Sequence, residues 1–387
     1  MATRRGTQRR KSSVAMDAVI LDAAVGVVLE SGPDDLNLSA VARTAGVTTG
    51  AVYSRYENRQ ELLLDVWDKR ASDALRQLIF LAAQASRGDT RAATQAAALL
   101  AARDPGPLAG IALMIAAPRI EELDEALIPQ VRSWFDPSSD SGAWDALVVV
   151  AFLLGALAFD AASGSPQRDW GRPLLWASTQ ALPAPTPRGS TDIDQDDQLL
   201  ELLNFKTGDE VRDQLLESMA LVVAKSGLKR ATTSRIARSA GYQQSAVFDL
   251  WPTRAQLVAE FVGIALQGMV RSTSPLGAPA LAGDAAAATE ALTRVLGPAY
   301  QRFRRLRLET VLAAMADGVV AALIAQSDAA ALTAMLGPQP DPAALGLAEA
   351  VRAVTLGCIL LEETVGGIES LDFTGPVAAL LGVAARP

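Results

Sequence analysis

Small polar side chains open a short predicted helix close to the start of the chain. The stretch GVTTGAVYSRYENRQEL, residues 46–62, places Thr48, Thr49 and Gly50 directly before aromatic and basic residues. Threonine methyls can contact thymine, threonine hydroxyls can bond to base edges or phosphate, and glycine permits close approach. A helix that begins with such residues can enter the major groove of DNA, with its first N–H groups facing phosphate. The stretch therefore predicts a helix that reads DNA.

The aromatic and basic residues of this stretch fit the phosphates beside such a groove. We expect the hydroxyls of Tyr53 and Tyr56 at the rim of the interface, and Val52 facing inward to hold the helix against its partner. Arginine supplies positive charge around them, at Arg43, Arg55 and Arg59. Together with the two threonines and the glycine, the two tyrosines and three arginines form the first candidate DNA-binding site.

A similar stretch returns later in the chain, as GYQQSAVFDLWPTRAQL at residues 241–257. A shift of 195 residues aligns the two stretches without a gap, and identities extend upstream to Leu21 and Leu216. A period this long excludes a solenoid and predicts a duplicated domain. The second candidate DNA-binding site comprises Thr233, Arg238, Gln243, Gln244, Ser245 and Arg254.

The second stretch departs from the first at positions that bear on DNA binding. Glutamine replaces both threonines and can bond bidentately to adenine. Phe248 lacks the hydroxyl of Tyr53, Leu250 replaces Arg55, and Asp249 adds a repulsive charge near phosphate. We therefore expect this half to bind DNA more weakly or to read another sequence, unless it is kept for structure alone.

The hydrophobic pattern predicts helices throughout, with no convincing alternating strand. An apolar stripe from Val19 to Val28 predicts the first helix, and Gly32 stands where a C-terminal cap belongs. Two short helices follow, at residues 38–45 and 48–55, separated by a glycine turn, and a long helix begins near Asn58. This order is that of a helix-turn-helix domain, and the predicted fold class is all-α.

The composition excludes several classes of chemistry. The 387 residues include no histidine and one cysteine, Cys358, so the chain forms neither an internal disulfide nor a histidine-based metal site or catalytic triad. No phosphate-binding loop is found, and we expect no enzyme, no cofactor and no metal. The longest apolar run, residues 146–159, is too short to cross a bilayer. We therefore expect a cytoplasmic, nucleoid-associated protein with no membrane association.

Charge is spread unevenly along the chain. The net charge is −8, yet residues 1–60 sum to +2 and residues 206–254 to +3. Two weakly basic segments in an acidic chain fit local phosphate binding, and ordinary scatter explains them equally well. The basic residues before position 13 fit either an arm that contacts DNA or a solubilising tail.

Both stretches resemble one known family of proteins. Residues 14–64 resemble the DNA-binding domain of TetR/AcrR-type transcriptional regulators, and residues 211–262 resemble it with the departures given above. The resemblance implies a helix-turn-helix domain on a larger helical ligand-binding and dimerisation domain. It also implies a homodimeric repressor that binds double-stranded operator DNA and is released by a small lipophilic effector. Because one chain supplies both units, we expect an intramolecular pseudo-dimer on an asymmetric operator with unlike half-sites, with further dimerisation left open.

The predicted organisation has two such units in tandem. Its segments are a basic arm (1–13), a first helix-turn-helix domain (14–60), a first helical ligand-binding and dimerisation domain (61–182), a linker (183–205), a second helix-turn-helix domain (206–255) and a second helical domain (256–387). Candidate helices for the shared bundle are residues 143–162, 167–182, 342–365 and 376–384. Candidate effector-binding segments are residues 106–118 and 307–325, for which simple helix packing is the alternative.

Two alternatives stay open. The basic turn YQRFRRLR, residues 300–307, can bind an anionic ligand, face the acidic residues 121–125, or form a charge cluster of its own. The alternative function is a helical ligand-binding or interaction protein in which one or both helix-turn-helix units no longer bind DNA.

Overall fold

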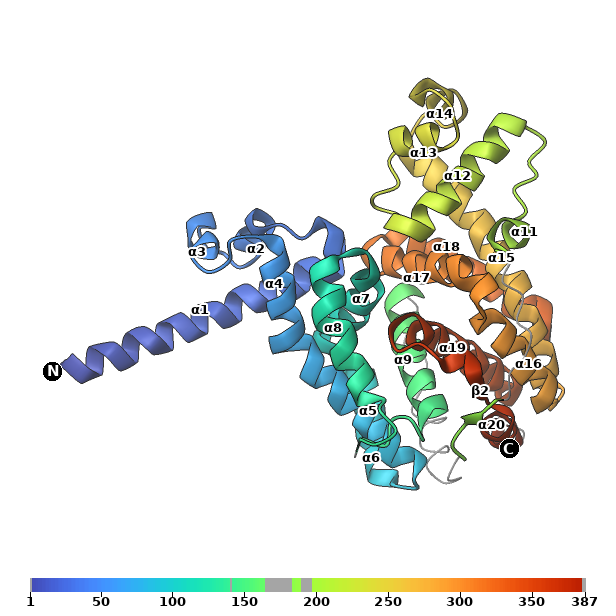
Figure 1. Ribbon diagram of the computed structural model, residues 1–387, viewed down its shortest axis with the longest axis horizontal. Coiled ribbons are helices and arrows are strands. Elements are labelled where there is room, and N and C mark those ends of the chain that lie inside the picture. The colour runs from blue at the N-terminus through green and yellow to red at the C-terminus, as the bar shows by residue number, and fades with distance from the viewer. Residues whose placement is uncertain (1, 140, 164–182, 189–196, 385–387) are drawn as a thin grey trace.

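The computed structural model of the chain describes residues 2–139, 141–163, 183–188 and 197–384, and these residues are mostly helical (Figure 1). The one pair of strands in the described part is two residues long on each side. β1 (Thr186–Pro187) pairs antiparallel with β2 (Leu371–Asp372). The prediction of a helical fold is therefore confirmed, with this small ribbon as an addition.

The first half contains nine helices among the described residues. They are α1 (Ala2–Ser31), α2 (Leu38–Thr44), α3 (Thr49–Tyr53), α4 (Arg59–Val66), α5 (Ser72–Ser86), α6 (Thr90–Ala102), α7 (Pro105–Ala116), α8 (Glu121–Trp134) and α9 (Leu147–Ser163). Short 3-10 turns lie at Pro33–Asp35 and Ala117–Arg119, and a π-helical turn, Trp67–Ala71, joins α4 to α5.

The second half follows the same order of long and short helices. They are α11 (Leu199–Leu203), α12 (Glu210–Ser226), α13 (Thr233–Ser239), α14 (Gln244–Leu250), α15 (Arg254–Leu281), α16 (Ala285–Leu296), α17 (Gln301–Ala316), α18 (Gly318–Leu336), α19 (Pro342–Thr364) and α20 (Thr374–Ala384). Two further 3-10 turns lie at Pro298–Tyr300 and Ile368–Ser370.

Side-chain caps fix where several of these helices begin. Asn37 accepts a hydrogen bond from the Ala40 N–H at the start of α2, and Asn58 accepts one from the Glu61 N–H at the start of α4. Asp284 caps α16 in the same way. Because these caps satisfy backbone donors that have no partner inside the helix, they set the boundaries that the sequence indicates.

Two expected segments need correction. α1 begins at Ala2, so residues 2–13, expected as a separate basic arm, continue the first helix. The expected linker 183–205 is partly ordered, because β1 pairs with β2 and α11 packs on α15 with Leu203 buried. The candidate bundle helix 167–182 lies outside the described residues.

α9 and α19 form the centre of the body and pack on each other more extensively than any other pair of helices in the described chain (Figure 1). Their contact is backbone to backbone. A Cβ on Gly155 would lie 1.8 Å from the Ala353 carbonyl oxygen, and one on Gly357 would lie 1.8 Å from the Ala151 carbonyl oxygen. The candidate bundle segments 143–162 and 342–365 therefore meet, whereas α20 packs mainly on α16.

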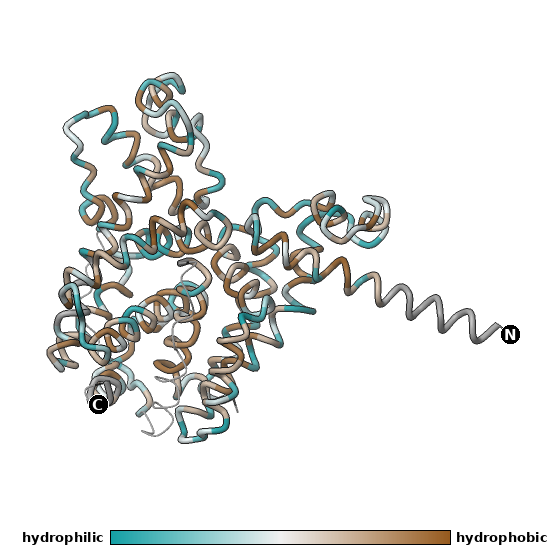
Figure 2. The backbone as a smooth tube through the Cα atoms, turned by 180° about the vertical axis from the view of Figure 1, so that it is seen from behind, coloured by the Kyte–Doolittle hydropathy of each residue, from teal (hydrophilic) through white to brown (hydrophobic). Residues whose placement is uncertain are grey.

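Apolar residues run through the helices of the body (Figure 2). By length and composition, α18 and α19 are the described helices apolar enough to cross a membrane. α19 has 61% of the relevant stretch buried inside the protein, and α18 has 17%. The burial of α19 follows from its packing on α9 and its neighbours.

The glycine contact between α9 and α19 can be tested with one substitution and a matched control. We expect Gly357→Ala to lower the free energy of unfolding by about 1–3 kcal/mol or more, because the new methyl must push two helix backbones apart. Gly346→Ala lies on the same helix with open space around it and should raise stability by about 0.5–1 kcal/mol. Denaturant unfolding of both variants checks this, and equal effects would contradict the close contact.

Candidate nucleic-acid interface

The first head, defined as α1, α2 and α3, has the geometry of a helix-turn-helix. The turn between α2 and α3 is made at Gly46, whose φ of 67° lies in the left-handed region that favours glycine. Thr48 then caps α3, since its hydroxyl oxygen accepts a hydrogen bond from the Ala51 N–H at 3.2 Å. Val52 is fully buried and holds α3 against the rest of the head, as expected.

The outer face of α3 is free for a partner. Thr48, Thr49 and Gly50 are exposed, and the Tyr53 side chain is 55% exposed. No side chain covers the space that a Cβ on Gly50 would occupy. The residues at the start of α3 therefore have the small size and accessibility that insertion into a groove requires.

Tyr56 does not lie at the exposed rim, where the sequence led us to expect it. Its side chain is 5% exposed, and its hydroxyl donates a hydrogen bond to the Asp65 carboxylate at 2.9 Å. Burial, and next the bond to Asp65, raises the pKa of Tyr56 well above its usual range. Tyr56 thus lies at the corner between α3 and α4 and joins the two helices, because its ring completes the core beneath α3.

The three arginines of the first candidate site have different surroundings. Arg43 is exposed on α2 and has no ion-pair or hydrogen-bond partner among the described residues. Arg55 pairs with Asp17 of α1 and donates to the Ala51 carbonyl at 3.0 Å. Arg59 donates to the Asp34 carbonyl at 2.7 Å. Of these three arginines, Arg43 is therefore the one without a partner among the described residues, and Arg55 and Arg59 also hold the helices of the head together.

The second head, defined as α12, α13 and α14, places its candidate residues on a comparable surface. Gln243 and Ser245 are exposed at the start of α14, and Arg238 is exposed on α13. Thr233 is half-buried and its hydroxyl accepts a hydrogen bond from the Gln244 amide at 2.8 Å. Gln244 is therefore already positioned by α13, whereas Gln243 is free to contact a base edge.

Two contacts tie the second head to α15. Arg254 donates to the Leu228 carbonyl at 2.9 Å, and the Trp251 indole N–H donates to the Glu260 carboxylate at 2.8 Å. Trp251 is buried, as Tyr56 is in the first head. Phe248, which stands where the first head has Tyr53, is 45% exposed and offers no hydroxyl.

The two heads meet in a buried cluster of charges, here called the head junction. Arg119, at the end of α7 and its 3-10 turn, donates to Asp34 at 2.6 Å and to Glu309 of α17. All three side chains are 6–8% exposed. From the second head, Arg230 approaches Asp34 at 3.1 Å and Lys229 pairs with Asp35 at 3.0 Å. The head junction was not predicted, because its members are scattered along the sequence and none belongs to a motif.

The basic turn at 300–307 does not face residues 121–125. Arg304 and Arg305 both pair with Glu363 of α19. Arg304 also donates to the carbonyls of Val295, Leu296 and Gly297 at the end of α16, at 3.1, 2.6 and 2.6 Å. These two arginines thus have acceptors inside the second body. Arg307, on the same helix, has a different environment.

Comparison with known proteins supports the interpretation of the first head. Residues 20–66 match the model of the family described as bacterial regulatory proteins, tetR family. The matched segment runs from within α1 to the end of α4 and so contains the whole α2–α3 pair. No curated protein gives a significant match to the chain. The chain therefore carries, near its N-terminus, a DNA-binding domain of the kind found in bacterial regulatory proteins of the tetR family.

Proposed function

We propose that the protein is a transcriptional repressor in which one chain supplies both DNA-reading heads, and that a small effector bound in the helical body releases it from DNA. The family match supports the first head. The observation that carries the rest of the proposal is the return of the same helices and turns, at one constant spacing, in the second half.

The helix boundaries support a tandem duplication. α2 begins at residue 38 and α13 at 233, α3 at 49 and α14 at 244, and α4 at 59 and α15 at 254. The body continues the series, since α6 begins at 90 and α16 at 285, and α9 at 147 and α19 at 342. Each pair differs by 195 residues, which is the shift that aligns the two sequence stretches. Independent helices would not share one spacing over both heads and both bodies.

Backbone conformation and contacts repeat at the same spacing. Positive φ angles occur at four pairs of glycines 195 residues apart: Gly32 and Gly227, Gly46 and Gly241, Gly88 and Gly283, Gly142 and Gly337. The hydrogen bond from Tyr56 to Asp65 has its counterpart in the bond from Trp251 to Glu260. A duplicated unit explains both facts, because backbone turns and corner contacts persist while individual side chains diverge.

The packing of α9 on α19 supports an intramolecular pseudo-dimer. These helices are the 195-residue counterparts of each other, and they meet as the two copies of one helix meet across a symmetric dimer. In Figure 1 the second head stands at the top of the molecule and the first head projects to the left, and both lie away from the C-terminus at the lower right. Their exposed residues differ, with threonines at positions 48 and 49 and glutamines at 243 and 244. The operator we propose therefore has two unlike half-sites.

The heads also differ in the electrostatics that DNA would meet. Asp249 is exposed on α14 itself, and Leu250 stands where the first head has Arg55. The second head should therefore contribute less binding free energy than the first. Fusion compensates for this, because binding of one head brings the other to the DNA at high effective concentration.

DNA binding can be tested with operator fragments selected from a random library. We expect Arg43→Ala to weaken binding across sequences and to reduce the slope of log affinity against log salt by about 1, because one phosphate contact is lost. Thr49→Ala should cost about 1 kcal/mol or more at one half-site. Arg91→Ala, at an exposed arginine of α6 in the body, is the control. Fluorescence polarisation measures the DNA affinity of all three variants.

The two-headed arrangement predicts one chain per operator and unlike half-sites in the selected fragments. Gln243→Ala should change base preference in one half-site only. A perfect palindrome that binds two chains would contradict the arrangement. Loss of binding in Gln243→Ala without loss in Thr49→Ala would show that the second head is the stronger one.

Glu309 at the head junction predicts a pH dependence of stability. Burial raises its pKa to about 7 from an ordinary 4.5, although Arg119 acts in the opposite direction. The folded protein therefore keeps a proton that the unfolded chain releases, and stability falls by roughly 3 kcal/mol as pH rises through this interval. Glu309→Gln cannot titrate but still accepts a hydrogen bond. Its melting temperature should fall less than that of the wild type between about pH 5 and pH 8. Calorimetry measures both melting temperatures, and an equal fall in the wild type and in Glu309→Gln would contradict this prediction.

A further inference from the structure

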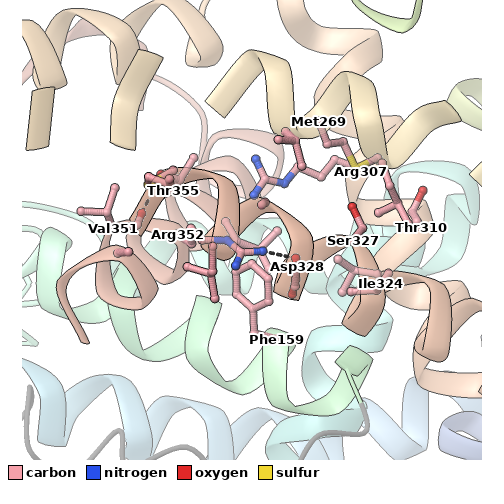
Figure 3. Close-up of a pocket in the computed structure, with 18 residues that line it drawn as sticks. Phe159, Met269, Arg307, Thr310, Ile324, Ser327, Asp328, Val351, Arg352 and Thr355 are labelled. Atoms are coloured by element: carbon pink, nitrogen blue, oxygen red, sulfur yellow. Dashed lines mark hydrogen bonds and ion pairs between the residues drawn. The ribbon is translucent and has the colours of Figure 1, made fainter. Parts of the chain in front are cut away.

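A cavity lies in the second body between α15, α17, α18 and α19, with Phe159 of α9 at its floor (Figure 3). The space open to the centre of a water molecule is about 70 Å³. That corresponds to roughly five to seven waters, or an organic molecule of similar bulk. Most of its wall is apolar, including Leu266, Met269 and Ile324. The segment 307–325, expected to hold an effector, contributes part of this wall, and Leu108 of α7, in the other candidate segment, lines a separate cavity of the first half.

Three charged side chains line this apolar space. Arg352 of α19 pairs with Asp328 of α18, and its guanidinium lies 5.2 Å from the centre of the Phe159 ring. Arg307 of α17 reaches toward the same space in Figure 3. Two arginines and one aspartate leave a net charge of +1 inside the cavity wall.

Arg307 carries this unbalanced charge. The residue is 7% exposed, and its Nη1 atom is buried without a hydrogen-bond partner among the described residues. Burial, and next the charge of Arg352, lowers the pKa of Arg307 to about 10. A buried guanidinium with an unpaired N–H is costly unless an acceptor reaches it. The cavity wall therefore carries a net positive charge and one buried donor without a partner, and the Oδ2 atom of Asp328 is likewise buried there without a hydrogen-bond partner among the described residues.

We infer that the cavity binds a small amphipathic carboxylate, whose oxygen accepts a hydrogen bond from Arg307 Nη1 and whose hydrocarbon part lies against the apolar wall. The guanidinium matches a carboxylate in charge and in planar geometry. A single negative charge neutralises the site. That this carboxylate is the effector rests on the proposed function. That the cavity binds a carboxylate rests only on the cavity and its charges.

The first body has no equivalent site. The residues 195 positions before Arg307, Asp328 and Arg352 are Ala112, Ser133 and Leu157, and none of them is charged. Ala112 is buried, and Leu157 lines a separate cavity of the first half together with Arg103 and Asp160. The two arginines and the aspartate of this cavity therefore have no charged counterparts in the first body.

The position of Arg307 also connects the cavity to the heads. Two residues further along α17, Glu309 accepts a hydrogen bond from Arg119 at the head junction. A carboxylate bound to Arg307 therefore contacts α17, the helix that also carries Glu309 of the head junction. Ligand binding can therefore change the relative position of the heads through α17, provided that the ligand prefers one arrangement over the other.

The test uses three probes of one chain length on the full-length protein: hexanoate, hexan-1-ol and hexylamine. We expect saturating hexanoate to raise the melting temperature by roughly 3 °C, because it binds only the folded state. The alcohol and the amine should give little or no shift. Isothermal titration calorimetry then gives the dissociation constant of hexanoate directly.

Arg307→Met keeps much of the side-chain length and removes the charge. We expect hexanoate to bind this variant about 10- to 100-fold more weakly, which is the usual cost of losing a hydrogen bond to a charged group. The variant without ligand should melt at or above the wild-type temperature, since it buries no unpaired charge. Arg302→Gln, at a 59% exposed arginine of the same helix, should bind hexanoate as the wild type does.

The outcomes separate this inference from the proposed function. Absence of a hexanoate shift in the wild type, or equal binding of hexanoate and hexanol, overturns the carboxylate site, whatever DNA binding shows. Undiminished hexanoate binding by Arg307→Met overturns the role of Arg307. If hexanoate binds but the affinity for a selected DNA fragment is unchanged, the carboxylate site is supported and release from DNA by this ligand is refuted.

Discussion

The close approach of α9 and α19 is the contact on which the rest of the structure depends. Gly155 and Gly357 each face a backbone carbonyl of the opposite helix with no room for a side chain. Helices that meet at this distance exclude other groups and fix each other's position along and around their axes. Since α7, α17 and α18 all pack on α9 or α19, the placement of each body, and through it of each head, follows from this contact.

The second level of organisation is electrostatic. The head junction joins residues of both heads to α17, and its central side chains, Arg119, Asp34 and Glu309, are nearly inaccessible to water, whereas Arg230 of the second head is 39% exposed. Its partners compensate one another, because Arg119 lies between two carboxylates and Asp34 between two arginines. Buried charges tolerate little change in their distances. The heads are therefore coupled to each other and to the body, with which they share one continuous apolar core.

The sequence was informative where structure is determined locally. Caps, glycine turns and apolar periodicity placed α2, α3 and the start of α4 within one or two residues, and several later helices begin 195 residues after earlier ones. Tyr56 was placed wrongly, because an aromatic residue near a helix end is equally compatible with a surface rim and with a buried corner. Its hydrogen bond to Asp65 selects the buried corner, and Asp65 lies about one helix turn beyond the recognisable motif.

The charged features of the bodies could not be predicted in the same way. Arg304, Arg305 and Arg307 belong to one basic turn in the sequence, yet the first two have carboxylate or carbonyl partners and the third faces a cavity. Which partner each arginine meets depends on the rotation of α17 against α16, α18 and α19. That rotation is set by tertiary packing, and no pattern within α17 itself encodes it.

One consequence of the α9–α19 contact concerns dilution. In a dimer of separate subunits the corresponding bundle falls apart when the protein becomes scarce, and its melting temperature depends on concentration. Here both helices belong to one covalent chain, so the bundle forms as a unimolecular event. Its integrity is the same for a single molecule in a cell as for a concentrated sample in a calorimeter.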